Sequence, residues 1–207
     1  MNGRTILFDA LTTREGSDLT FDVWYLNHYL PAMSARSNWL GMRRYGSPAL
    51  GSYLAVFESD EASVDLGTPP PAHESVIRIE RYLARHIGEQ TAAGAEPDIL
   101  EADFLYPVIF DVPEERQSEF ERWYVEEHLD ILLSCPYWQM CRRFKVIDPV
   151  PGAPTHIALH YLTDLRALES EARTRARSTP WRQRFAAEPW FRGDYRVYHR
   201  HGKGRAR

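Results

Sequence analysis

The chain has 207 residues and a mass of 24.0 kDa, which is enough for one large domain or two small ones with cores of their own. Apolar residues make up 43% and charged residues 26%, which is typical of a folded globular protein and excludes a disordered chain. The net charge of -4 gives no general attraction for phosphate groups, so we expect no nucleic-acid partner.

The sequence carries no sign of membrane attachment. Its apolar runs are too short to span a bilayer, and its first residues lack the basic and apolar regions of a signal peptide, so we expect a cytoplasmic protein without a membrane partner. The basic stretch from Arg200 to Arg207 is expected to be a solvated tail. Cys135 and Cys141 have no CxxC spacing, and we expect them to be buried free thiols.

The most informative feature is an internal repeat. With a shift of 99 residues, the segment Phe21–Tyr45 aligns without a gap on Phe120–Phe144. Seven of the 25 positions are identical: Phe21/Phe120, Trp24/Trp123, Tyr25/Tyr124, Leu30/Leu129, Trp39/Trp138, Arg43/Arg142 and Arg44/Arg143. Identities that include adjacent Trp and Tyr residues exceed what shared composition produces, and we interpret the repeat as a duplication.

Each copy begins with a short apolar run, residues 6–11 and 104–110, which predicts a buried strand. A helix is expected after each strand. In the second copy it starts at Pro113, since proline followed by two glutamates suits the first helical turn. In the first copy Ser17 or Asp18 is the expected cap.

Three more strands are expected in each copy. The second strand contains an Arg-Arg-aromatic triplet, and the third and fourth are short segments rich in apolar residues. The expected segments are residues 39–46, 52–58 and 78–83 in the first copy and 138–146, 156–162 and 194–200 in the second. The sequence therefore predicts an α+β fold with the order β-α-β-β-(α)-β repeated twice.

These elements define the expected domains. We predict one ferredoxin-like repeat over residues 3–88, a linker over 89–101, a second repeat over 102–201 and a basic tail over 202–207. The copies differ after the third strand, because the first has a proline-rich loop where the second has a charged, helix-favouring run at residues 164–178.

One motif resembles a known family. Trp123-Tyr124-x-x-x-His128-Leu129, which follows a strand and the turn DVPEE and precedes an Arg-Arg-aromatic strand, resembles the EthD-like branch of the dimeric α/β-barrel superfamily. The resemblance implies four-stranded antiparallel sheets that pair face to face into a barrel, with helices outside and a ligand cavity within. A tandem copy implies that one chain builds a pseudo-dimeric barrel, present as a monomer or a homodimer of such chains.

His128 is the foremost catalytic candidate. At helical spacing it shares a stripe with Phe120 and Tyr124 near the end of the predicted helix, beside Glu127. A histidine at a cavity mouth acts as a general acid or base at neutral pH, whereas the alternative is a histidine that only caps a helix. Tyr29 occupies the matching position of the first copy and is a candidate for substrate binding.

His160 is the second candidate. In the segment HIALHYL, residues 157, 159 and 161 share one face, which we expect to contact the helices. His160 then faces the barrel interior, where Tyr53 and Phe57 of the first copy form an aromatic wall. The alternative is a histidine that fills space in the core.

Two further groups complete the predicted site. Arg43 and Arg142 belong to strand pairs of which one member is expected to face the lumen and hold a carboxylate or enolate oxygen, unless both only pair with glutamates at the surface. Trp123 is expected either beside the substrate or as a core anchor. The segment with Trp181 and Trp190 is expected to form a lid or a packed helix.

The sequence lacks the GxGxxG, Walker, HExxH, GxSxG and paired CxxC motifs. His156 and His160 stand about 13 Å apart along a strand, so we expect no metal site and no cofactor. The predicted function is a cofactor-independent isomerase, cyclase or lyase acting on a small hydrophobic or carbonyl-containing metabolite. The alternatives are a non-catalytic protein that binds such a metabolite and a haem-binding barrel, since the superfamily has many functions.

Overall fold

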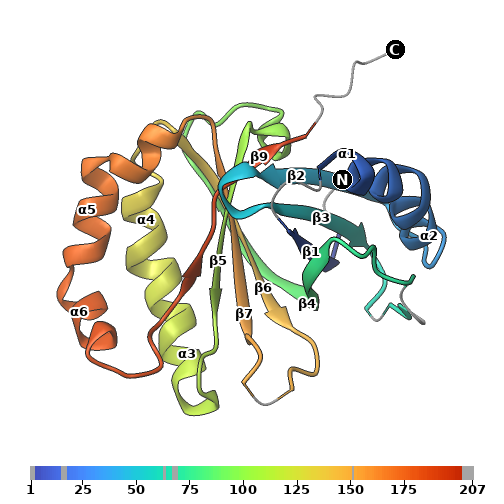
Figure 1. Cartoon of the computed structure of the whole chain (residues 1–207). Helices are drawn as coiled ribbons and strands as arrows, with labels where there is room; N and C mark the ends of the chain where they lie inside the picture. Colours follow the sequence, from blue (N-terminus) through green and yellow to red (C-terminus); the bar gives the residue numbers. More distant parts are fainter. Residues whose placement is uncertain (1–2, 15–17, 63, 67–69, 151, 202–207) are drawn as a thin grey trace. The chain divides into compact units, whose positions relative to one another are not determined.

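A computed structural model describes residues 3–14, 18–62, 64–66, 70–150 and 152–201 (Figure 1). The described chain divides into two compact units, unit 1 up to His86 and unit 2 from Ile87 onward. The possible cap Ser17 and the basic tail at residues 202–207 lie outside the described residues.

Unit 1 has the order strand, helix, strand, strand, strand. Its elements are β1 (Thr5–Thr13), α1 (Asp18–Trp24), a π-helical turn (Tyr25–Tyr29), α2 (Leu30–Ser34), β2 (Gly41–Ser47), β3 (Ser52–Ser59) and β4 (Val76–Thr91). The strands form an antiparallel sheet in the order β4-β1-β3-β2. Because β4 extends to Thr91, residues 89–91 of the expected linker are part of a strand.

Unit 2 has the same order with two additional helices. Its elements are β5 (Phe104–Phe110), α3 (Glu114–Trp123), a π-helical turn (Tyr124–His128), α4 (Leu129–Leu132), β6 (Trp138–Val146), β7 (His156–Leu162), α5 (Glu171–Ser178), α6 (Pro180–Ala186), β8 (Asp194–Tyr195) and β9 (Tyr198–Arg200). Strand β7 pairs antiparallel with β6 and β5, and β8 and β9 pair with β5. Helices α3–α6 stand along one side of these strands (Figure 1). The expected α+β fold is confirmed.

The fourth strand expected at residues 194–200 is broken into β8 and β9. Strand β8 pairs with Val108 and Ile109, and β9 pairs with Phe104 and Leu105. Between these two segments the N–H of Arg196 donates to the carbonyl of Pro107, at 3.2 Å. Proline has no N–H to donate in return, so the hydrogen-bond ladder is interrupted opposite it.

Both units contain a π-helical turn within the helix that follows the first strand. In unit 2 the N–H of Leu129 donates to the carbonyl of Tyr124, and in unit 1 the N–H of Leu30 donates to that of Tyr25. The two turns lie at matching positions of the sequence repeat, 99 residues apart. Such i→i+5 turns are rare and frequently occur at functional sites.

The strand faces that contact the helices are the opposite of those predicted from the sequence. Ala158 and Leu162 of β7 pack into the core beneath the helices, so His160, on the same face, is also directed to them. The prediction that His160 faces a barrel interior is therefore wrong. Tyr53 and Phe57 likewise pack against the helix of unit 1, not in a lumen. Alternation did not decide the orientation, because the opposite face of β7 is also apolar.

Two expectations about the whole chain can be compared with the structure. Cys135 and Cys141 are buried free thiols, as expected. Among the residues that the structure describes, no helix is long and apolar enough to cross a membrane.

Candidate active site in unit 2

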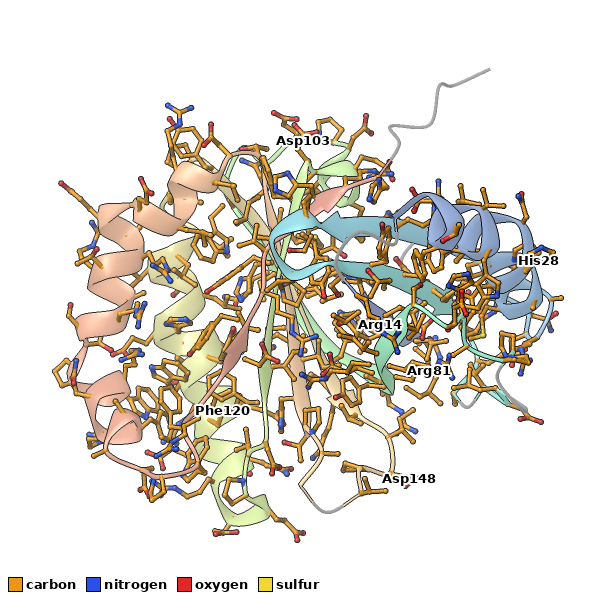
Figure 2. The ribbon with its side chains drawn as sticks, viewed as in Figure 1. Arg14, His28, Arg81, Asp103, Phe120 and Asp148 are labelled. Atoms are coloured by element: carbon orange, nitrogen blue, oxygen red, sulfur yellow. The ribbon has the colours of Figure 1, made fainter. Side chains whose placement is uncertain are left out.

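A pocket of about 40 Å³ lies in unit 2 between its sheet and its helices. A single water needs roughly 10–15 Å³ of cavity measured in this way, so the enclosed part holds only a few non-hydrogen atoms. The residues that line it are Tyr106, Val108, Phe110, Trp123, Tyr124, His128, Leu132, Trp138, His160, Arg173, Arg177, Arg182, Phe191 and Tyr195. Phe120, in the same layer of side chains, has its ring 5.5 Å from that of Tyr124 (Figure 2).

The π-helical turn brings three of the predicted residues together. The ring of His128 lies 4.6 Å from the ring of Trp123 and 5.2 Å from that of Tyr124. A turn with one extra residue changes the angular spacing of the side chains that follow it, so that residues at both of its ends point to the pocket. The three residues of the sequence motif therefore lie together at the pocket, although the pattern assumed an ordinary α-helix.

His160 is held by hydrogen bonds at both ring nitrogens. The indole N–H of Trp138 donates to Nδ1 at 2.9 Å, and Nε2 lies 2.8 Å from the hydroxyl of Tyr124. Because an indole can only donate, Nδ1 must accept, and the neutral ring carries its proton on Nε2. Burial lowers the pKa of His160 to about 3, so the ring is neutral at pH 7.

Tyr124 is consequently a hydrogen-bond donor with a free proton. Its oxygen accepts from His160, so its own O–H is left free to donate. Burial raises the pKa of Tyr124 well above its usual value, which keeps the hydroxyl protonated. The buried thiol of Cys141 lies 3.8 Å from Nε2 of His160, and burial raises its pKa as well.

His128 is neutral and has an unused nitrogen. Burial lowers its pKa to about 3, Arg182 and Arg177 act in the same direction, and a hydrogen bond to the Ala176 carbonyl opposes them. Its Nδ1 is buried and has no hydrogen-bond partner among the described residues. The bond to Ala176 therefore involves Nε2–H, which leaves the lone pair of the ring on Nδ1.

Glu127, the other expected neighbour of His128, has a structural role. Its Oε1 accepts from the indole of Trp123 at 3.0 Å and from the hydroxyl of Thr179 at 2.6 Å. Thr179 caps helix α6 by accepting from the N–H of Arg182. Glu127 thus joins the π-helical turn to α6, and Tyr124 is the polar neighbour that faces the pocket.

The predicted arginines do not line this pocket. Arg43 forms an ion pair with Glu58 in unit 1, at 2.6 Å, as its alternative interpretation stated. Arg142 is fully buried and lies over the ring of Phe144, at 5.1 Å. The pocket instead receives Arg173, Arg177 and Arg182 from α5 and α6. The charged run was visible in the sequence, but nothing there indicated that it packs beside His128.

Tyr29, which matches His128, belongs to a different cluster in unit 1. Its hydroxyl donates to Oδ2 of Asp9 and accepts from Arg81, both at 2.6 Å, and Nε of Arg81 lies 2.8 Å from Oδ1 of Asp9. Arg81 and the exposed His28 of the same unit are labelled in Figure 2. The polar atoms of this cluster are satisfied by one another, so Tyr29 has a structural role here.

Haem does not fit the pocket. Pockets for drug-sized ligands have volumes of roughly 300–1,000 Å³. The pocket in unit 2 has a volume of only about 40 Å³. His160 has no nitrogen available for iron, because both accept or donate a hydrogen bond. We therefore assign no haem to this pocket.

Comparison with known proteins supports the fold. No protein-family model and no functionally curated protein matches the chain. An anthrone oxidase-like protein of known structure superposes with a TM-score of 0.68 at 14% identity, over 97% of this chain and 92% of that one. A mutant chlorite dismutase from Candidatus Nitrospira defluvii superposes with a TM-score of 0.59 at 9% identity, over 98% and 92%.

A haem-degrading enzyme from Listeria monocytogenes gives a TM-score of 0.53 at 10% identity, over 94% of this chain and 98% of that one. A ferredoxin-fold protein related to antibiotic biosynthesis monooxygenases, also from Listeria monocytogenes, gives 0.53 at 11% identity, over 97% and 96%. The chain therefore shares its overall fold with these four structures, one of which is described as a ferredoxin-fold protein. At such low identities these likenesses concern the fold alone.

Proposed function

We propose that unit 2 is the catalytic part of a cofactor-independent enzyme that removes a proton from a carbon next to a carbonyl group of a small metabolite. His128 is the general base and Tyr124 stabilises the enolate. The observation that carries the proposal is the unpartnered Nδ1 of His128 in a pocket that also contains the free hydroxyl proton of Tyr124. An isomerase, a cyclase or a lyase begins with this step.

His128 and Tyr124 together account for the transferred proton and the negative charge that it leaves behind. The C–H proton moves to Nδ1 of His128, and the electrons of that bond move onto the carbonyl oxygen, which accepts a hydrogen bond from Tyr124. In the empty pocket burial and the arginines keep His128 neutral. The negative charge of the enolate then stabilises the imidazolium beside it, which strengthens the base when it is needed.

His160 is a positioning residue in this proposal. Since Trp138 occupies its Nδ1, His160 donates from Nε2 to Tyr124 and orients the hydroxyl toward the pocket. The polar chain Trp138–His160–Tyr124 is buried throughout, so its members are held in one arrangement. This differs from a role in which His160 exchanges protons with substrate.

The relation to the superfamily extends the proposal. The motif at Trp123–Leu129 and the matching π-helical turns support a place in the EthD-like branch and an origin by tandem duplication.

Deuterium uptake tests the proposal directly. The protein is incubated in D2O with acetone, 2-butanone, pyruvate or methyl pyruvate, and exchange of the protons next to the carbonyl is followed by proton NMR. We expect exchange above the buffer rate with at least one of the four. His128→Gln should lower that rate by about 100-fold or more, because general base catalysis contributes roughly 10²–10⁴-fold.

Tyr29→Phe is the matched control, since Tyr29 occupies the same repeat position in unit 1 and should leave the rate unchanged. Two outcomes would overturn the proposal: no exchange above buffer with any of the compounds, or equal rates for the wild type and His128→Gln. Saturable binding without exchange would favour the non-catalytic binding protein.

A further inference from the structure

Three arginines at the mouth of the pocket have no carboxylate partner. Within the part of the chain that the structure describes, Arg173, Arg177 and Arg182 form no ion pair with Asp or Glu. Arg173 donates to the carbonyl of Leu168 at 2.7 Å, and Arg182 donates to that of Arg177 at 3.3 Å. Guanidinium groups of surface helices usually have acidic neighbours, so an unpaired group of three needs an explanation.

The positive charges of all three arginines act on the hydroxyl group of Tyr195. Burial raises the pKa of Tyr195, and all three arginines act on it in the opposite direction. Burial and the charges of Arg177 and Arg173 lower the pKa of Arg182, whereas its side-chain hydrogen bond to Tyr195 raises it. Arg177 and Arg182 also act on His128. The guanidinium groups are therefore close enough to repel one another and to affect the proposed base.

This arrangement is unfavourable in the empty protein. Arg173 and Arg177 stand four residues apart on α5, a spacing at which like charges destabilise a helix. Helix α5 is also drawn close to the π-helical turn, because its inward residues Ala172 and Ala176 are small and buried. The fold thus brings positive charge to the pocket at a cost that a bound anion would remove.

We infer that the substrate is a small carboxylate, a 2-oxo or 3-oxo acid, whose carboxylate is held by Arg177, Arg182 and Arg173 while its carbonyl group reaches Tyr124 and its C–H bond faces His128. This inference rests on the proposed function and names its substrate class. The planar carboxylate matches the fork of donors on a guanidinium group. The enclosed volume of about 40 Å³ admits the small reacting end, and the charged end stays at the open side near the exposed Arg177.

A bound carboxylate also raises the pKa of His128. Neutralising Arg177 and Arg182 removes an influence that lowers the pKa of His128, so that a carboxylate substrate makes His128 a stronger base than it is in the empty pocket. An uncharged ketone of the same shape lacks this effect. The structure therefore predicts selection for charge in the chemical step as well as in binding.

Binding to a variant that cannot catalyse separates this inference from the proposed function. His128→Gln protein is titrated with pyruvate and with methyl pyruvate, which differ in charge, and binding is measured by ligand-observed NMR. We expect pyruvate to bind at least tenfold more tightly than its ester. Arg177→Gln should then reduce pyruvate affinity by about tenfold to a hundredfold, which is the usual contribution of a charge-assisted hydrogen bond.

Arg175→Gln is the matched control on the same helix, because Arg175 bonds to Ser134 and does not line the pocket. Equal binding of acid and ester, binding of neither, or equal losses in the Arg177 and Arg175 variants would overturn the inference. Displacement of pyruvate by inorganic phosphate at lower concentration than by acetate would also overturn it in favour of a phosphate ester. A preference for pyruvate without any deuterium exchange in the wild type would refute the proposed chemistry alone.

Discussion

The helix–sheet layers of the two units share one backbone framework but differ in the polar side chains that it carries. In each unit a π-helical turn follows the first helix and places two aromatic or imidazole side chains over the sheet. In unit 1 these are Tyr25 and Tyr29, and in unit 2 they are Tyr124 and His128. The comparison shows that backbone geometry alone does not make a site, because the outcome depends on which polar atoms remain without a partner.

The residues opposite the turns explain the difference. Strand β1 carries Asp9 opposite Arg81, and these two satisfy the hydroxyl of Tyr29. The matching pair in unit 2 is Val108 opposite Tyr195, which offers His128 no charged partner. The units also differ on the other strand that pairs with β1 or β5. Strand β3 has Phe57 at the position where β7 has His160. Unit 1 thus has an internal ion pair, whereas in unit 2 Nδ1 of His128 has no hydrogen-bond partner among the described residues.

Breaking the ion pair of unit 1 should have the largest effect on stability. Asp9→Asn removes the charge that holds Arg81 and Tyr29, and loss of one partner of a buried pair costs about 3–5 kcal/mol. Urea unfolding measures the change. A loss below about 1 kcal/mol, or a folded variant that loses deuterium exchange, would contradict the structural role assigned to this cluster.

Removing the tyrosine hydroxyl at the start of each π-helical turn should lower the deuterium exchange rate in unit 2 only. Tyr124→Phe takes away the donor to the enolate, and we expect exchange to fall by about 10²–10³-fold, the usual cost of losing such a donor. In Tyr25→Phe the exchange rate should be unchanged, because the buried hydroxyl of Tyr25 has no hydrogen-bond partner among the described residues. Equal rates in the two variants would show that the units are not specialised in this way.

Giving unit 2 the residue of unit 1 should produce a pH-dependent change in stability. At pH 7, His160→Phe leaves Trp138 and Tyr124 without their partner, which costs about 1–3 kcal/mol. The folded pKa of His160, about 3, lies below its usual value, so its contribution is complete above about pH 6.5 and is lost as the pH falls toward 3. The variant lacks this loss.

The difference in unfolding free energy between the wild type and His160→Phe should therefore shrink between pH 6.5 and pH 4, by up to about 1.4 kcal/mol per pH unit. Denaturant unfolding of both proteins at several pH values measures it. A difference that does not vary with pH would mean that His160 is not buried in its neutral form.

The smallest expected effect concerns α5, which has no counterpart among the described residues between β3 and β4. Arg177→Gln relieves the repulsion with Arg173 and should stabilise the protein by about 0.2–0.5 kcal/mol at low salt, less at high salt. Arg175→Gln should have the opposite sign, since Arg175 stands four residues after Glu171. Thermal unfolding of both variants at two salt concentrations is the test, and a destabilised Arg177→Gln would mean that the three charges do not repel.

Much of the fold was predictable from local patterns. The apolar runs predicted β1, β5, β3 and β7, and the glutamates after Pro113 predicted the start of α3. The repeat also brought Trp123, Tyr124 and His128 to attention, because adjacent Trp and Tyr residues are rare enough to align with confidence. These features depend on short-range periodicity and composition, which a sequence contains directly.

The orientation of the site was not predictable in the same way. Both faces of β7 are apolar, so only packing against α3 and the π-helical turn decided that His160 meets Tyr124 and not a barrel lumen. The π-helical turn itself adds one residue within a continuous helical pattern, and no residue type marks it.

The sequence by itself determined the strands, the first helix of each unit and the identity of the aromatic and imidazole residues. Only the tertiary structure decided which polar atoms are satisfied, because that depends on neighbours distant in the chain: Asp9 with Arg81 in unit 1, and Trp138 with His160 in unit 2. It also brought the arginines of α5 and α6 to His128, through buried alanines that carry no chemical signal of their own.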